Sequence, residues 1–182
     1  MDQGLKEIYQ DRVVPKMMNQ FGFDNPFMVP KVVKVVVNVG LGEATQNQAV
    51  VERVLSYLAL ITGQRGIPTL ARKSISGFKL RKGEAIGVKV TLRRKRMYAF
   101  LERLLRTTLP RTRDFKGLSV EAFDAAGNYT IGLPEQLVFP ELNFDQIDRP
   151  RGLEISLVTD TSDSKLARVL LEELGFPFKK DG

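Results

Sequence analysis

Residues 71–96 hold the densest charge in this 182-residue chain, with ten Lys and Arg side chains against one acid, Glu84. Ammonium and guanidinium groups at this density neutralise phosphates, so the segment is typical of a polyanion contact. Its first half, 71–83, contains Gly77 and Gly83 with only three large apolar residues and predicts a loop. Its second half alternates apolar and polar residues as a strand does. A basic loop followed by a basic strand face therefore indicates nucleic-acid binding.

The charge is distributed unevenly along the chain. Residues 1–64 have six bases and six acids, residues 65–113 have fifteen bases and two acids, and residues 114–182 have seven bases and thirteen acids. Such asymmetry indicates the kind of partner rather than the fold. It predicts a polyanion at the middle of the chain and leaves the acidic last third able to meet a basic protein.

Two residue types are absent, and their absence excludes several kinds of chemistry. The sequence has no Cys, so disulfides and thiolate metal sites are excluded, and no His, so Ser-His and Cys-His nucleophile pairs are excluded as well. The carboxylates that could act instead lie in predicted loops and turns: Glu43, Asp114, Asp124, Glu135, Glu141, Asp145 and Asp148. Neither a cofactor nor a bound metal is expected.

Two alternatives to nucleic-acid binding remain open. Glu141, Asp145 and Asp148 could hold a hard cation such as magnesium through oxygen ligands. A metal-dependent hydrolase acting on RNA, with the carboxylates of 135–148, is therefore one alternative. A protein-binding scaffold on which the basic cluster has no function is the other.

Apolar spacing predicts the elements of the first half of the chain. An amphipathic helix is expected over 3–20, kinked or divided by Pro15. A strand is expected over 32–39, with Val33, Val35, Val37 and Val39 on its core face and Lys34, Val36 and Asn38 on the other. Thr45 and Gln48 predict a capping box for a helix from about 47 to 62. Residues 64–70 show no clear element.

The second half is predicted in the same way. A strand begins at 85, with Lys89, Thr91 and Arg93 on its polar face, and a helix follows 94–96 and ends before Pro110. Residues 119–123 and 129–132 predict a hairpin around the turn 124–128. Residues 133–152 form a long, partly irregular connection, followed by a strand over 153–159 and a helix near 163–174.

These elements predict an α+β fold with a mostly antiparallel sheet of about five strands, helices packed on one face and a protruding basic loop. The length suits a single RNA-binding domain over 1–182. The N-terminus shows no secretory signal, and the longest apolar runs have five residues. We therefore expect a cytoplasmic protein without a membrane partner.

If the two predicted strands pair, their polar residues form one surface on the open face of the sheet. This surface has five members: Lys34, Asn38, Lys89, Thr91 and Arg93. Lysine and arginine contact phosphates, whereas asparagine, threonine and a nearby Gln64 can meet a 2′-hydroxyl or a base edge. Because Asn is a poor strand former on an otherwise strong strand, we favour a binding role over a merely solvated face.

The segment ARKSISGFKLRKGEAIGVKVTLR resembles the signature of the family of 5S-rRNA-binding proteins of the bacterial large ribosomal subunit. The resemblance extends over the whole chain, through KVVVNVGLGEA, TGQR, PRTRDFKGLS, GNY, GLPEQ, FPE and the closing GFPFK. One position departs from the family pattern, which has glycine after Thr-Leu-Arg where this chain has Arg94. An altered turn and an added charge are expected there.

The resemblance implies a structural, non-enzymatic ribosomal protein whose partners are 5S rRNA, peptidyl-site tRNA, large-subunit rRNA and ribosomal proteins, and a small-subunit head protein. It implies an rRNA-binding surface made of Lys34, Asn38, Gln64, Lys89, Thr91 and Arg93. It implies a tRNA-contacting loop, Ala71–Gly83, with Arg72, Lys73, Ser76, Phe78, Lys79, Arg81 and Lys82. The candidates for a bridge between subunits, from the loops around 111–116 and 134–151, are Arg111, Arg113, Lys116, Glu135, Glu141 and Asp145.

Overall fold

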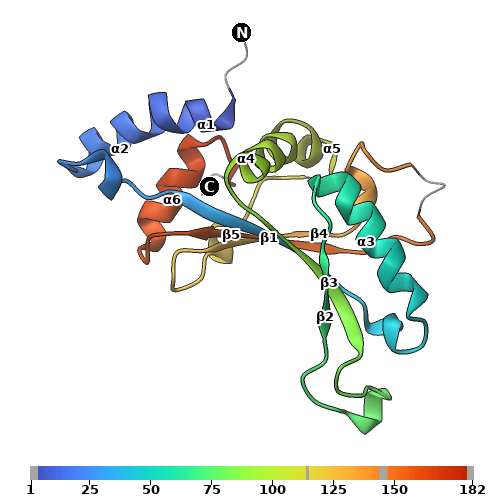
Figure 1. Ribbon diagram of the computed structural model, residues 1–182. Helices are drawn as coiled ribbons and strands as arrows, with labels where there is room; N and C mark the ends of the chain where they lie inside the picture. Colours follow the sequence, from blue (N-terminus) through green and yellow to red (C-terminus); the bar gives the residue numbers. More distant parts are fainter. Residues whose placement is uncertain (1–3, 114, 144–146, 180–182) are drawn as a thin grey trace. The chain divides into compact units, whose positions relative to one another are not determined.

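The structure is a computed structural model that describes residues 4–113, 115–143 and 147–179. Five strands form one sheet in the order β2-β3-β1-β5-β4 (Figure 1). Their bounds are Val32–Gly40 for β1, Ile67–Leu70 for β2, Ala85–Leu92 for β3, Tyr129–Leu133 for β4 and Leu153–Thr159 for β5. The prediction of an α+β fold with a mostly antiparallel sheet is confirmed. Within the described residues, no helix is both long and apolar enough to cross a membrane.

The sheet has five strands, but one of them is not among those predicted. Residues Ile67–Leu70 form β2, which pairs antiparallel with β3 at the edge of the sheet, where Pro68 is tolerated. The strand predicted over 119–123 is wrong. Ser119 Oγ accepts a hydrogen bond from the backbone N–H of Glu121 and starts the 3₁₀ turn Val120–Ala122. Only Phe123 keeps a bridge, to Tyr129, across the predicted turn.

The chain divides into two compact units. The first comprises Met1–Val35, Arg93–Ile131 and Ser156–Gly182, and the second comprises Val36–Leu92 and Gly132–Ile155. The single RNA-binding domain expected from the chain length stays a prediction.

In the first unit, two helices pass through a proline after a π-helical turn. Helix α1 (Leu5–Ile8) leads through the π-turn Tyr9–Val13 into α2 (Val14–Phe21), and α4 (Arg94–Arg103) leads through Leu104–Thr108 into α5 (Leu109–Arg111). Pro15 and Pro110 stand in the first turn of α2 and α5, where a missing N–H is tolerated. The predicted helix end before Pro110 is therefore wrong, and the chain also stays helical through Pro15, so a division of the helix there is wrong as well.

Helix α6 (Ser164–Glu173) completes the first unit and matches its prediction. Asp163 Oδ1 accepts a hydrogen bond from Lys165 N at 2.8 Å, and Gly175 follows the helix with a φ of 98°. Lys16 Nζ of α2 donates to Glu173 at 2.6 Å. The rings of Phe123, Tyr129 and Phe178 pack together.

In the second unit, helix α3 (Ala49–Thr62) packs on β3. The predicted capping box is wrong, because Thr45 Oγ1 donates to Gly42 O within the 3₁₀ turn Gly42–Thr45. Asn47 Oδ1 instead accepts from Ala49 N at 3.1 Å, so the helix begins later than predicted. Gly63 ends it with a φ of 67°, as expected.

Strand β1 alternates as predicted from Val35 onward, with Val35, Val37 and Val39 fully buried. Val33 does not belong to this core face, as its side chain is 36% exposed while Val32 is 4% exposed. Two residues rather than one separate the buried Val32 and Val35, so the alternation shifts at this point. The side opposite the buried valines, which carries Asn38, stays open.

Candidate nucleic-acid interface

The polar sheet face, defined here as Asn38, Lys89 and Thr91, lies in the second unit on β1 and β3. Each of the three side chains is wholly or partly exposed, while their neighbours Val37, Val39, Val88 and Val90 are buried. In the described part of the chain, these three side chains make no hydrogen bond or ion pair with protein groups. Their amide, ammonium and hydroxyl groups are thus available to a partner.

Gln64 is fixed beside this face by the end of α3. Thr62 Oγ1 donates to the carbonyl of Gln64 at 2.9 Å, and Gln64 Nε2 donates to the carbonyl of Thr91 at 3.0 Å. The structure therefore places Gln64 next to Thr91, while its part in RNA binding stays a prediction. Its amide nitrogen serves to hold the β3 backbone.

Gly87 allows the strands around the polar sheet face to approach closely. A Cβ atom at this position would lie 2.6 Å from Thr69 Oγ1 and 2.9 Å from the carbonyl oxygen of Val39. Only glycine fits between these atoms without a shift of the backbone. The sequence analysis did not single out Gly87, although a glycine inside an alternating strand is a signal of such close approach.

Lys34 and Arg93, the remaining members of the predicted rRNA surface, belong to the first unit. Lys34 is partly exposed on β1, four residues before Asn38. Arg93 is exposed and stands at the N-cap of α4. The next residue, Arg94, is exposed and has a φ of 52°, a left-handed conformation that favours glycine. The expected alteration of this turn relative to the family stays a prediction.

Loop 71–83 is a hydrogen-bonded extension of β2 and β3 (Figure 1). Ala71 N donates to the carbonyl of Glu84 at 2.8 Å, and Gly83 N donates to the carbonyl of Ala71 at 2.9 Å. Further out, Ile75 and Leu80 form an isolated antiparallel bridge around the 3₁₀ turn Ser76–Phe78. These bonds give the loop a defined path and hold its side chains outward.

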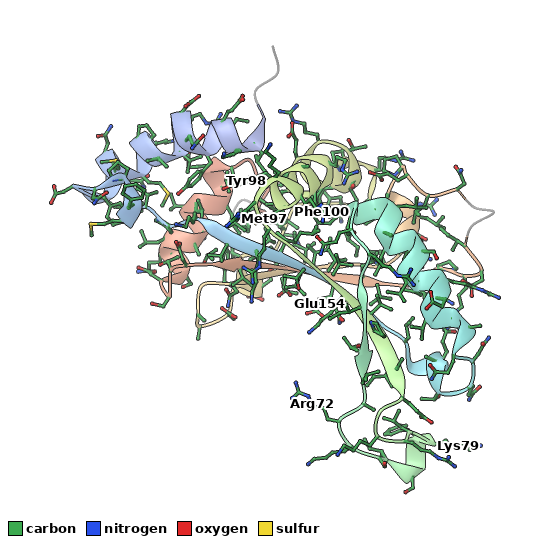
Figure 2. All side chains as sticks on the ribbon, in the orientation of Figure 1. Arg72, Lys79, Met97, Tyr98, Phe100 and Glu154 are labelled. Carbon is green, nitrogen blue, oxygen red and sulfur yellow. The ribbon has the colours of Figure 1, made fainter. Side chains whose placement is uncertain are left out.

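Five exposed cations surround this extension: Arg72, Lys73, Lys79, Arg81 and Lys82. Within residues 4–113, 115–143 and 147–179, none of the five forms an ion pair. The acid of the loop, Glu84, accepts a hydrogen bond from the backbone N–H of Arg81. Figure 2 shows Arg72 and Lys79 extending to different sides of the loop. The positive field of the loop is therefore not cancelled locally.

Asp148, one of the three carboxylates considered for a cation site, is bound by arginines, and so is Glu43. Arg151 donates from Nε to Glu43 Oε1 at 2.7 Å and from a terminal nitrogen to Asp148 Oδ2 at 2.8 Å. Arg149 also pairs with Glu43, and Arg53 with Asp148. Hydrogen bonding and attraction by Arg151 hold the pKa of Asp148 well below its usual range.

Guanidinium groups thus occupy the Asp148 oxygens that the alternative cation site would need. The structure shows no group of metal ligands among its described residues. Two of the candidate carboxylates, Asp114 and Asp145, lie outside the described residues. Arg151 was not among the predicted residues, and its three-residue spacing from Asp148 was the available signal.

The bridge candidates fall into separate units. Arg111, Arg113 and Lys116 are exposed in the first unit, whereas Glu135 and Glu141 are partly exposed in the second. Asp145, the sixth candidate, lies outside the described residues.

Comparisons with known proteins point to one family. The model of "Ribosomal protein L5" matches residues 25–81, and that of the "ribosomal L5P family C-terminus" matches residues 85–178. A relative from Rippkaea orientalis, named large ribosomal subunit protein uL5, is 52% identical over 98% of this chain and 99% of its own length. One of the same name from Dictyoglomus thermophilum is 56% identical over 97% of this chain and 98% of its own. The chain belongs to the ribosomal protein L5 family.

Proposed function

We propose that the protein attaches 5S rRNA to the large ribosomal subunit through its open sheet surface. Membership of the L5 family makes the chain a structural, non-enzymatic constituent of the large ribosomal subunit in the cytoplasmic ribosome. Within that role, 5S rRNA binding by Lys34, Asn38, Gln64, Lys89, Thr91 and Arg93 is our specific proposal.

The polar sheet face is the observation that supports this proposal most directly. An ammonium, an amide and a hydroxyl group emerge from two strands of a rigid sheet without protein partners in the described residues. Lysine can neutralise a phosphate, and the amide and hydroxyl can bond a ribose 2′-hydroxyl or a base edge. Because β1 and β3 fix the spacing of these groups, they suit an RNA of one defined shape.

Loop 71–83 is proposed as a separate contact, with peptidyl-site tRNA. The loop projects its cations beyond the end of the sheet strands, and their charge is not compensated by nearby acids. Such a segment contacts the phosphates of an RNA backbone with little dependence on base sequence. Arg72, Lys73, Ser76, Phe78, Lys79, Arg81 and Lys82 are the residues we assign to it.

A bridge to a protein of the small-subunit head is the third proposed contact. Exposed Arg111, Arg113 and Lys116 in one unit, and Glu135 and Glu141 in the other, supply charges of both signs. The net negative charge of residues 114–182 is compatible with a basic protein partner.

Binding of 5S rRNA to single variants tests the proposed surface. Asn38→Ala and Thr91→Ala should each weaken binding, and Lys89→Ala should also reduce the slope of log affinity against log salt by about 0.7–0.9. Lys6→Ala, which removes an exposed lysine of α1, is the control and should leave the affinity unchanged. Wild-type binding by all three sheet variants would refute the proposed surface.

The loop is tested by replacing Arg72, Lys73, Arg81 and Lys82 together with glutamine. This variant should bind 5S rRNA nearly as well as the wild type and should weaken tRNA contact in assembled ribosomes. Loss of 5S rRNA binding would show instead that the loop belongs to the primary rRNA surface.

A further inference from the structure

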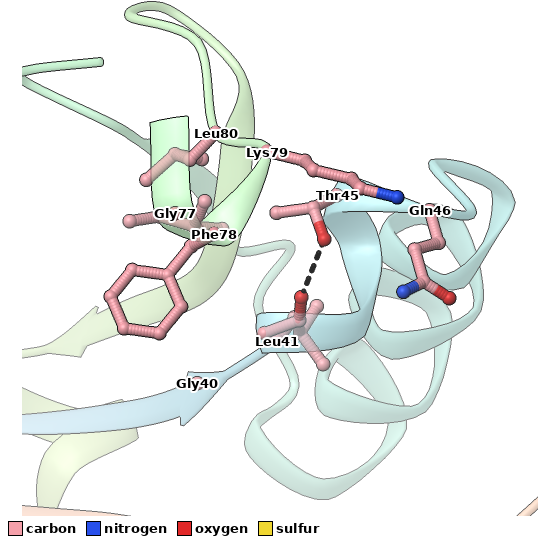
Figure 3. Close-up of a pocket in the computed structure, with 10 residues that line it drawn as sticks. Gly40, Leu41, Thr45, Gln46, Gly77, Phe78, Lys79 and Leu80 are labelled. Carbon is pink, nitrogen blue, oxygen red and sulfur yellow. Dashed lines mark hydrogen bonds between the residues drawn. The ribbon is translucent and has the colours of Figure 1, made fainter. Parts of the chain in front are cut away.

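A pocket of about 570 Å³ lies in the second unit, between the tip of loop 71–83 and the 3₁₀ turn Gly42–Thr45 (Figure 3). Apolar groups line it: Leu41, Phe78, Leu80 and Ile86. The Thr45 hydroxyl, the Gln46 amide and the Lys79 ammonium add polar groups to its lining. Gly40, Gly42 and Gly77 complete the walls without side chains. The size is within the range of small-ligand pockets, roughly 300–1,000 Å³.

Two side chains at the loop tip stand out. Phe78 is 73% exposed, although a ring of its size is normally buried. Lys79 adopts a φ of 52°, a left-handed conformation that is unfavourable for a non-glycine residue. In Figure 3 the Lys79 side chain extends past Thr45 towards Gln46, while the Phe78 ring lies on the other side of the turn. Backbone strain of this kind often accompanies a binding role.

The opposite wall of the pocket is held rigidly. Glu43, inside the turn Gly42–Thr45, is bound by Arg151 and Arg149. Thr45 Oγ1 donates to the carbonyl of Gly42 at 2.9 Å, which closes the turn on itself (Figure 3). The wall facing the loop tip is thus preorganised, so little ordering is needed when a ligand enters.

We infer that this pocket receives one unstacked base of the tRNA whose backbone runs along loop 71–83. A base has two apolar faces, which suit Leu41, Phe78 and Leu80, and a polar edge, which suits Thr45 and Gln46. Its phosphate must lie nearby, and Lys79 and the other loop cations supply the complementary charge. Proteins recognise single-stranded RNA by this combination of stacking on aromatic rings and edge hydrogen bonds.

The inference rests on the proposed tRNA contact and adds to it a base-binding site behind the charged loop. An acidic peptide would use the same cations, but it would not need an apolar pocket beside an exposed aromatic ring. The two ligands can be distinguished by a substitution that adds bulk to the pocket and leaves every charge of the loop in place. Such a substitution should block a base but not an acidic peptide.

Gly77→Leu adds a bulky side chain at a residue that lines the pocket, and it does so without a clash, because no atom lies within 4 Å of a Cβ at this position and its φ is not left-handed. Gly42→Leu adds a bulky side chain to the opposite wall of the pocket on the same grounds. Gly132→Leu on β4 is the matched control, at a glycine that also faces open space but does not line the pocket.

The first experiment titrates the full chain with the four ribonucleoside monophosphates and follows the backbone amides by NMR. Shifts should saturate at Thr45, Gln46, Gly77 and Lys79, and Gly77→Leu and Gly42→Leu should weaken binding about tenfold or more, as expected when base stacking is lost. Gly132→Leu should behave as the wild type. Identical shifts with inorganic phosphate alone, no saturable shift, or full binding by both blocked variants would overturn the inference.

The second experiment identifies the source of the base by chemical probing of RNA in ribosomes that contain each variant. One unpaired tRNA base should become more reactive with Gly77→Leu than with Gly132→Leu. A change in 5S rRNA alone, or no change in either RNA, would refute the assignment. If the loop-neutralised variant weakens tRNA contact while Gly77→Leu does not, the proposed function stands and the base pocket is rejected. If neutralisation has no effect, the proposed tRNA contact itself fails.

Discussion

The Arg151 guanidinium contacts the Glu43 carboxylate, with 2.7 Å between Nε and Oε1, although 108 residues separate the two in the chain. The Arg151 side chain is 5% exposed, and its terminal nitrogens bind Asp148. Gln136, fully buried, donates from Nε2 to the carbonyl of Arg149 at 2.8 Å. Together these bonds tie the connection 133–152 to the turn Gly42–Thr45.

Replacing Arg151 with alanine should destabilise the protein by about 2–3 kcal/mol, below the 3–5 kcal/mol typical of a broken buried pair, since Glu43 and Asp148 are partly exposed. Urea unfolding measures the change. The control is Arg65→Ala, which breaks the exposed pair with Glu52 and should cost less than about 0.5 kcal/mol. Equal losses in the two variants would show that the buried cluster contributes no more than a surface ion pair.

Asp148 should make stability depend on acid pH. Because Arg151 holds its pKa below the unfolded value of about 4, the carboxylate contributes stability above that pH, and this contribution declines as pH falls through the folded pKa. Asp148→Asn should therefore lower the free energy of unfolding at pH 7 and flatten its decline below about pH 4. In an Arg151→Met background the same substitution should change the slope little. An unaltered slope in the single variant would contradict the assignment.

Local patterns were sufficient to predict the faces of β1 from Val35 onward and of β3. Period-two alternation placed Val35, Val37 and Val39 in the core and Asn38 on the open face, because side-chain direction in a strand is set by the backbone alone. The same rule placed Lys89 and Thr91. All three residues of the polar sheet face could thus be placed from sequence.

Features that depend on distant partners could not be predicted. Strand β2 contains Pro68 and does not alternate clearly, so it is defined by its pairing with β3 rather than by its own sequence. Arg151 is buried because two acids and a buried glutamine surround it, and one of those acids is 108 residues away. The pocket behind loop 71–83 likewise requires the tip of one hairpin to face a turn some thirty residues earlier.

Two buried tyrosines should respond differently to loss of the hydroxyl. Burial raises the pKa of both Tyr57 and Tyr129 to about 12, so each hydroxyl is a neutral donor at pH 7. Tyr129 donates to the carbonyl of Ser119 at 2.7 Å, whereas the Tyr57 hydroxyl has no hydrogen-bond partner among the described residues. Tyr129→Phe should therefore lower the free energy of unfolding by about 1 kcal/mol, and Tyr57→Phe should leave it unchanged or raise it. Thermal unfolding of the two variants measures the change. An equal loss of stability in both would indicate that the Tyr57 hydroxyl also has a hydrogen-bond partner.

At Arg94 the effect of the side-chain charge and the effect of the backbone conformation can be measured separately. With a φ of 52° the residue occupies a conformation that glycine adopts freely and other residues adopt at a cost. Arg94→Gly and Arg94→Ala both remove the guanidinium, but only glycine relieves the backbone. We expect the glycine variant to be more stable than the alanine variant by about 0.5–1 kcal/mol in urea unfolding. Both should lose the same salt-dependent part of RNA affinity, because they lose the same charge. Equal stability of the two variants would mean that the turn at Arg94 relaxes without cost and that glycine is not required there.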